Sequence, residues 1–397
     1  MRVLLTTESY LPYLSGVTVS VDSLARGLGA RGHEVLVLAP RPAWGSAPEP
    51  VGSPGPAPRH AWLASYQLPI VAPPAYRMPT PLPHPGGLRA ARAFAPDVVH
   101  AHSPFVTGRL ARGLASELNL PLVFTHHTRF ADYGHYLGPL AGPGARLVDA
   151  YLRRFWAACA AIVAPSEDLA REIRARLQAR HAGRVHVIPT GVDVAGIRAL
   201  APIDPRAEAG WPTDSLVVAS LGRLAPEKSP DLLLEAVALA AARVPSLRLT
   251  LIGGGPSEEP LRERVARPDL AARVHMTGAV PRPDALARLL GADLFLFTSR
   301  TETQGLVLAE ALTAGLPAVA VAGPGVGESV RDGVDGIVVA DAPARSVPDR
   351  LADAIVALAD PSRRAAMAGR ARADADRFAA DRRVGEVEDL YERLRRR

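Results

Sequence analysis

Two glutamates, Glu302 and Glu310, lie eight residues apart where a short aromatic run, typical of a buried strand, passes into a predicted helix. We expect Glu302 in the turn and Glu310 about two turns into the helix. The backbone amides of Gln304, Gly305 and Leu306 open that helix, and unsatisfied amides at a helix start favour an anion. Carboxylates touching the anion would repel it, so we expect them to bind hydroxyl groups on either side, one on a sugar and one on a ribose. Alternatively, Glu302 is an ordinary acid at a helix start and Glu310 lies on a solvated face.

Two cations follow an earlier predicted strand, Leu216–Gly222. They are Arg223 and Lys228, and Lys228 is the only lysine among 46 basic residues. A guanidinium can chelate a diphosphate through its planar fork, whereas an ammonium acts as a point charge. With the helix start at Gln304, the two cations would form a diphosphate site. The other interpretation is a pair of surface charges in a loop.

The N-terminal half carries two histidine pairs at the ends of successive predicted strands. His100 and His102 form the first pair, and His126 and His127 form the second. We expect both pairs to face one crevice. Gly16 lies in the loop of the opening strand–helix–strand unit, where a single glycine is weak evidence for phosphate binding.

Apolar strand-like runs alternate with helical stretches along the whole chain, which indicates an α/β fold. Proline and glycine between Pro189 and Asp193 mark a linker. We therefore predict two doubly wound, Rossmann-like domains that face a cleft, residues 1–193 and 194–377. A charged helical stretch runs from about Arg364 to the end, and its last part, about 378–397, is expected to pack back onto the first domain.

The composition is that of a globular protein, with 48% apolar and 22% charged residues and no run near the ~20 apolar residues of a membrane span. Glu8 interrupts the apolar start, unlike a signal peptide, so we expect a cytoplasmic protein. Cys159 is the only cysteine and lies among alanines, which indicates a small core residue. The net charge of +6 suits an anionic substrate or membrane surface, and no nucleic-acid motif accompanies it.

These motifs, in their order along nearly the whole chain, resemble the retaining glycosyltransferases of family 4, which have the GT-B fold. The strongest element is the E-x7-E pair. The resemblance implies that Glu302 contacts the donor sugar, Glu310 the ribose and His127 the transferred hexose, with no metal required. It implies donor-binding roles for Gly16, Arg223, Lys228, Gly253, Val280, Glu302, Gln304, Gly305, Leu306 and Glu310, and catalytic roles for His127, Arg223, Lys228 and Glu302.

The segment Thr125–Tyr136 is similar to that of bacterial glucosyltransferases that place an α-glucose on diacylglycerol. This narrower resemblance implies acceptor-binding roles for Asp132, Tyr133, His135 and Tyr136. The chain departs from that group around residues 41–87, and relatives with phosphatidylinositol or soluble acceptors share most of the motifs.

The predicted helix Arg146–Trp156 also bears on the acceptor. It combines an aromatic face with several arginines, which suits a helix lying on an anionic bilayer. We expect Arg153, Arg154, Phe155 and Trp156 to meet the membrane. Alternatively, the aromatic face packs on the sheet and the arginines are merely solvated.

Together these features predict an enzyme that moves a hexose, glucose from UDP-glucose in the favoured case, to a hydroxyl of diacylglycerol or another membrane lipid. It would be attached peripherally to the inner face of the plasma membrane. A soluble or phosphatidylinositol-type acceptor, a sugar-nucleotide epimerase and a non-catalytic sugar-nucleotide sensor are the alternatives. A dehydrogenase is disfavoured because Gly16 lacks the G-x-G-x-x-G context.

Overall fold

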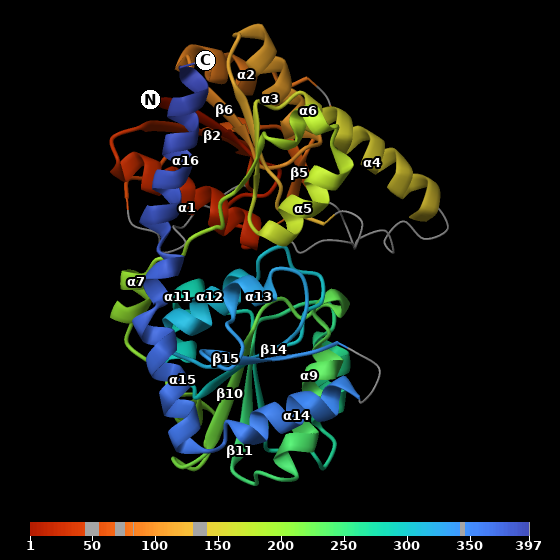
Figure 1. Cartoon of the computed structure of the whole chain (residues 1–397), viewed down its shortest axis with the longest axis vertical. Coiled ribbons are helices and arrows are strands. Elements are labelled where there is room, and N and C mark those ends of the chain that lie inside the picture. Colours follow the sequence, from red (N-terminus) through yellow and green to blue (C-terminus); the bar gives the residue numbers. More distant parts are fainter. Residues whose placement is uncertain (44–54, 68–75, 82, 130–140, 342–345, 397) are drawn as a thin grey trace. The chain divides into compact units, whose positions relative to one another are not determined.

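The computed structural model describes residues 1–43, 55–67, 76–81, 83–129, 141–341 and 346–396. It separates into two compact units, Met1–Gly191 with Ala380–Arg397, and Val192–Ala379. Each unit is built around one parallel sheet with helices against it (Figure 1). Within the described ranges, every helix is too short or too polar to span a bilayer.

The sheet of the first unit has the order β3-β2-β1-β6-β7-β8-β9, and all its strand pairs are parallel. The strand order reverses between β1 and β6, as in doubly wound sheets. The strands are β1 (Arg2–Thr6), β2 (Glu34–Pro40), β3 (Arg59–Leu63), β6 (Val98–Ala101), β7 (Leu122–Thr125), β8 (Ala161–Ala164) and β9 (Val185–Val187), and a separate antiparallel pair is β4 (Ser65–Gln67) with β5 (Arg77–Pro79).

Alternate residues of these strands enter two different cores. Leu4 of β1 lies in the core with α2, α3, α4 and α5, whereas Val3 and Leu5 lie in the core with α1 and α16. The sheet is thus covered on both faces, which explains why its strands are continuous apolar runs. The helices are α1 (Gly16–Ala30), α2 (Pro85–Phe94), α3 (Val106–Glu117), α4 (Ala141–Ala157), α5 (Glu167–Arg176), α6 (Ala179–Ala182) and α16 (Ala380–Arg395).

The C-terminal helix α16 packs across α1 (Figure 1) and buries Val387 and Tyr391 in the core of the first unit. Glu388 of α16 also ties the helix to the residues that follow α1. It accepts a hydrogen bond from Arg31 Nε at 2.5 Å and lies 2.7 Å from His33 Nε2. The predicted continuous helical stretch from about Arg364 is wrong in one respect. It is broken between α15 (Pro361–Ala373) and α16 (Ala380–Arg395), where the chain returns to the first unit.

The second unit has the sheet order β12-β11-β10-β13-β14-β15, again parallel throughout. Its strands are β10 (Leu216–Leu221), β11 (Leu247–Ile252), β12 (Val274–Gly278), β13 (Leu294–Phe297), β14 (Ala318–Val321) and β15 (Gly336–Val339). Its helices are α7 (Val194–Ala199), α8 (Pro205–Ala209), α9 (Pro230–Ala241), α10 (Glu258–Val265), α11 (Arg282–Leu290), α12 (Leu306–Thr313), α13 (Val326–Ser329), α14 (Val347–Ala357) and α15 (Pro361–Ala373), with 3-10 turns η2 (Pro226–Lys228) and η3 (Ala375–Phe378). The predicted α/β fold class is confirmed in both units.

Candidate active site

The predicted donor residues of the second unit follow the C-terminal ends of four adjacent strands. Arg223 follows β10, Gly253 follows β11, Val280 follows β12 and Glu302 follows β13. Because these strands are parallel neighbours, their C-terminal ends meet at one edge of the sheet. This edge is where doubly wound sheets bind ligands.

The lysine of the predicted diphosphate site is joined to a predicted sugar-binding carboxylate. Lys228 Nζ pairs with Glu302 Oε1. Hydroxyl groups tie the two loops together, because Thr298 Oγ1 donates to Lys228 O at 3.1 Å and Thr301 Oγ1 donates to Glu227 O at 3.2 Å. The cation and the carboxylate therefore share one small region, and a ligand of either group must compete with the other.

Glu310 is fully buried in α12, and its two oxygens differ. Oε1 pairs with Arg282, whereas Oε2 has no hydrogen-bond partner among the described residues. The helix begins at Leu306, after Gly305 in the left-handed region with φ 73°. Glu310 thus lies about one turn into the helix, and the expectation of two turns is wrong because residues 302–305 form an irregular turn.

Arg282 was not foreseen from the sequence. A signal for it existed, since it follows β12 at the same sheet edge and is the first residue of α11. Arg223, by contrast, is 39% exposed, and its Nη1 lies 3.7 Å from Glu227 Oε1. Arg223 is therefore the more accessible guanidinium for an incoming anion.

Glycines allow the loops of this edge to touch through their backbones. A Cβ at Gly253, where φ is 128°, would collide with the carbonyl oxygen of Gly222. A Cβ at Gly255 would likewise meet Leu224 O. The backbone of Gln304 is held by a side chain, because Ser329 Oγ donates to its carbonyl oxygen at 3.2 Å. The floor of the site is thus made of closely packed main chain.

Three histidines of the first unit, His100, His102 and His127, form a connected cluster at the ends of β6 and β7, whereas His126 packs against Trp156. His102 Nδ1 lies 2.9 Å from His127 Nε2, so one ring donates and the other accepts. His100 lies 2.5 Å from the hydroxyl of Tyr391 and 2.7 Å from that of Thr125. Tyr391, which comes from α16, was not foreseen because it lies 291 residues further along the chain.

Burial keeps these histidines uncharged at neutral pH. Removal from water lowers the pKa of His127 to about 4 and the pKa values of His100 and His126 to about 3. The neutral ring of His127 can hydrogen-bond a hydroxyl but carries no charge. Gly16 is the first residue of α1, after a cap in which Ser15 Oγ accepts from Thr18 N at 3.2 Å.

Comparison with known proteins identifies the family. Residues 14–195 match the model of Glycosyltransferase Family 4, and residues 204–374 match that of Glycosyl transferases group 1. A D-inositol 3-phosphate glycosyltransferase of Jonesia denitrificans is 30% identical over 96% of this chain and 91% of its own length. The chain belongs to glycosyltransferase family 4. It is accordingly a retaining hexosyltransferase that uses a nucleotide-sugar donor.

Other similar proteins also match most of the chain. An alpha-monoglucosyldiacylglycerol synthase of Acholeplasma laidlawii is 29% identical over 85% of this chain and 84% of its own. The crystal structure of Anabaena Alr3699/HepE in complex with UDP and glucose has a TM-score of 0.73, with 20% identity over 99% of this chain and 100% of that one. The structural likeness supports the GT-B fold of this family 4 enzyme.

The predicted membrane helix of this glycosyltransferase has a different exposed face from the one expected. Phe155 and Trp156 are buried in the core beside the sheet, and the prediction that they meet the membrane is wrong. Tyr151 donates to Pro104 O at 2.6 Å. Leu147 is 73% exposed, and Arg154 is exposed too. The helix packs its aromatic side inward, and its exposed residues include the predicted Arg153, which pairs with Asp149 at 2.7 Å.

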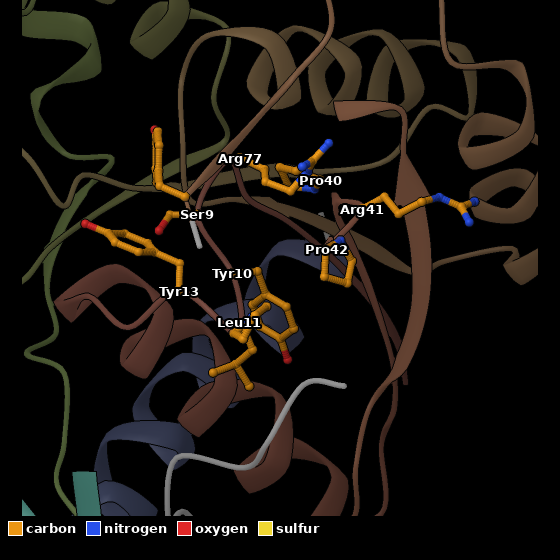
Figure 2. A pocket seen from close by; sticks show the side chains of 10 residues that line it. Ser9, Tyr10, Leu11, Tyr13, Pro40, Arg41, Pro42 and Arg77 are labelled. Carbon is orange, nitrogen blue, oxygen red and sulfur yellow. The ribbon is translucent and has the colours of Figure 1, made fainter. Parts of the chain in front are cut away.

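The predicted acceptor residues Asp132, Tyr133, His135 and Tyr136 lie outside the described residues. The described part of this side of the enzyme contains a small pocket after β1 and β2 (Figure 2). Figure 2 shows Ser9, Tyr13 and Arg77 around it, while the guanidinium of Arg41 points away. The pocket is lined by residues 9–13, 40–42, 76 and 77, none of which was predicted from the sequence to belong to a site. Among the side chains described, no cluster of His, Cys, Asp or Glu is suited to a metal ion.

Proposed function

We propose that this glycosyltransferase transfers glucose from UDP-glucose to a hydroxyl group of a membrane lipid, diacylglycerol in the favoured case. The observation that carries the donor half is the buried carboxylate of Glu310, whose Oε2 has no protein donor among the described residues. A buried acceptor without a hydrogen bond costs about 1–3 kcal/mol or more. Hydroxyl groups of a ribose would supply the missing donors.

The reaction then follows from the charges at the sheet edge. Arg223 and Lys228 would neutralise the diphosphate as the bond to the sugar breaks, which lowers the barrier electrostatically. Glu302 would accept from hydroxyls of the hexose. The neutral ring of His127 would orient the sugar and would not act as a nucleophile. The acceptor hydroxyl would attack from the face that the diphosphate leaves, and a donor phosphate oxygen would take its proton.

The lipid acceptor is supported by a relative and by a helix surface. The Acholeplasma laidlawii protein is named an alpha-monoglucosyldiacylglycerol synthase. On α4, exposed Arg146, Leu147 and Arg154 form a basic face with one apolar side chain, which suits reversible attachment to an anionic bilayer. We therefore propose a cytoplasmic enzyme, peripheral on the inner face of the plasma membrane.

A transfer assay tests both halves. Purified enzyme is incubated with radiolabelled UDP-glucose or GDP-mannose and with one of three acceptors: diacylglycerol in anionic vesicles, inositol 3-phosphate, or none. We expect an α-glucosyl lipid from UDP-glucose and vesicles, and NMR of the product would establish its anomeric configuration. Labelled inositol phosphate as the product would show that the acceptor is soluble and would contradict the proposed lipid acceptor. Turnover of GDP-mannose would contradict UDP-glucose as the proposed donor. An altered sugar nucleotide formed without acceptor would indicate an epimerase.

A further inference from the structure

We propose that Arg282 is a positioning residue that holds the Glu310 carboxylate ready for the ribose of the donor. The inference rests on the proposed nucleotide-sugar function and deepens it. Arg282 Nη2 pairs with Glu310 Oε1, and the side chains are 18% and 0% exposed. Arg282 is the first residue of α11, and Glu310 lies in the next helix, α12. The strands that precede these two helices end at the same edge of the sheet.

The first step concerns the energy of the buried acid. A carboxylate taken fully out of water is costly unless a cation and hydrogen bonds compensate it. Arg282 supplies both at Oε1. A carboxylate has about four lone-pair sites, so Oε2 can still accept from a ligand. The pair thus leaves one oxygen engaged and the other available.

The second step concerns geometry. Holding Oε1 restricts rotation of the carboxyl group and thereby fixes where Oε2 lies. A group whose orientation is set before the ligand arrives loses less entropy on binding. Arg282 therefore acts on the ribose through Glu310.

The third step separates Arg282 from a phosphate ligand. Its charge is already opposed by the carboxylate that it contacts, and it is the less exposed of the two arginines. Arg223 is more accessible, and its nearest carboxylate contact is 3.7 Å long. Arg223 and Lys228 are thus the diphosphate ligands of the proposed site, and Arg282 belongs to its ribose side.

The test compares nucleotides with and without ribose hydroxyls. UDP and 2′,3′-dideoxy-UDP are titrated calorimetrically into wild-type enzyme and into the Arg282→Met, Arg282→Lys, Glu310→Gln and Arg223→Ala variants; GDP and its dideoxy form replace them if the enzyme binds GDP instead. Because hydrogen bonds to a charged acceptor are at stake, we expect the wild type to prefer UDP by about 10- to 100-fold. Arg282→Met should bring this preference below about threefold while dideoxy-UDP affinity stays within about twofold.

The variants provide controls for folding and for role. Unchanged dideoxy-UDP binding shows that Arg282→Met is folded, and Arg282→Lys should restore part of the preference. Arg223→Ala should weaken both ligands alike. Arg288→Met serves as a matched control, since Arg288 lies on the same helix but pairs with Glu208, and it should change neither affinity.

Three outcomes would overturn the inference. If Glu310→Gln abolishes the preference and Arg282→Met does not, Arg282 is not the positioning residue, although the ribose assignment of Glu310 stands. If Arg282→Met weakens UDP and dideoxy-UDP equally, Arg282 acts on the diphosphate or on folding. If the wild type shows no preference for the ribose hydroxyls, both the inference and the proposed ribose role of Glu310 fail.

Discussion

Replacing Glu302 by Gln should strengthen the binding of free UDP while impairing transfer. Lys228 Nζ pairs with Glu302 Oε1, yet the proposed reaction requires the same ammonium on the diphosphate. The carboxylate therefore competes with UDP for Lys228. The Glu302→Gln change would remove that competition and the negative charge, and the amide of the new side chain could still hydrogen-bond a hydroxyl group.

The exposure of the pair sets the magnitude. The side chain of Lys228 is 31% exposed and that of Glu302 is 17% exposed, so the pair is neither fully solvated nor fully buried. Exposed ion pairs contribute about 0–1 kcal/mol, and breaking buried pairs costs about 3–5 kcal/mol. An intermediate value of about 1–2 kcal/mol corresponds to a gain in UDP affinity of about 5- to 30-fold.

Calorimetry with UDP measures the gain directly. Lys228→Met should weaken UDP, and the double variant should bind no better than Lys228→Met, since the competition exists only through Lys228. Glu259→Gln is a matched control, because it removes one exposed carboxylate from α10 of the same unit. In the transfer assay, Glu302→Gln should lower kcat, because the hexose loses a charged acceptor.

Two results would refute this reasoning. Weaker UDP binding in Glu302→Gln would mean that Glu302 supports the nucleotide rather than competing with it. An equal gain from Glu302→Gln in the presence and absence of Lys228 would show that the effect comes from the general loss of negative charge.

Two further predictions concern the first unit. Burial lowers the pKa values of His100 and His126 from 6.5 to about 3. Between pH 3 and pH 6.5 the unfolded chain therefore binds more protons than the folded chain, and stability is lost as the pH falls below about 6.5. Urea unfolding should show a loss of roughly 2 kcal/mol per histidine between pH 7 and pH 5, and an unchanged unfolding free energy would contradict the buried neutral state. In vesicle cosedimentation, binding should rise with anionic lipid, fall in high salt, and weaken by about 1 kcal/mol for each of Arg146→Ala and Arg154→Ala. A wild-type enzyme that ignores anionic vesicles at low salt would favour a soluble acceptor.

The fold could be predicted because its signals are local. Strands such as β1 and β13 are buried on both faces and are therefore continuous apolar runs, and helical stretches separate them. The residues after these strands could also be placed at one sheet edge, since parallel strands end together. Arg223, Lys228 and Glu302 could thereby be placed near one another without any knowledge of their contacts.

The orientation of α4 shows where local patterns were misread. Helical spacing groups Leu147, Tyr151 and Phe155 on one face, but the buried residues near the end of the helix are Leu152, Phe155 and Trp156. With the half-buried Tyr151, these lie at the i, i+1, i+4 and i+5 spacing of a core-facing stripe, which was a readable signal against membrane insertion. The basic and aromatic composition of the helix fits a bilayer or a core equally well, but this spacing of its apolar residues favours the core.

Pairings between distant side chains were beyond the sequence. Nothing local indicates that Glu310 meets Arg282 or that Tyr391 meets His100, because each pair depends on how separate helices pack. The start of the helix that carries Glu310 was also predicted wrongly. Gly305, with its positive φ, delays the helix and places Glu310 one turn in, at the depth where Arg282 reaches it.

The ion pairs Arg282–Glu310 and Lys228–Glu302 of the second unit use different cations, and this difference gives a physical reason for the single lysine. The guanidinium of Arg282 is a planar fork, suited to holding the buried Glu310 in one orientation. The ammonium of Lys228 is a compact point charge on a flexible stem, and Lys228 and Glu302 both retain contact with solvent. In the proposed reaction Glu310 must stay in place, while Lys228 must exchange its carboxylate partner for the diphosphate. An arginine in place of Lys228 would bind Glu302 through its fork and resist that exchange, so a chain that otherwise uses arginine has a lysine at the position where the partner changes.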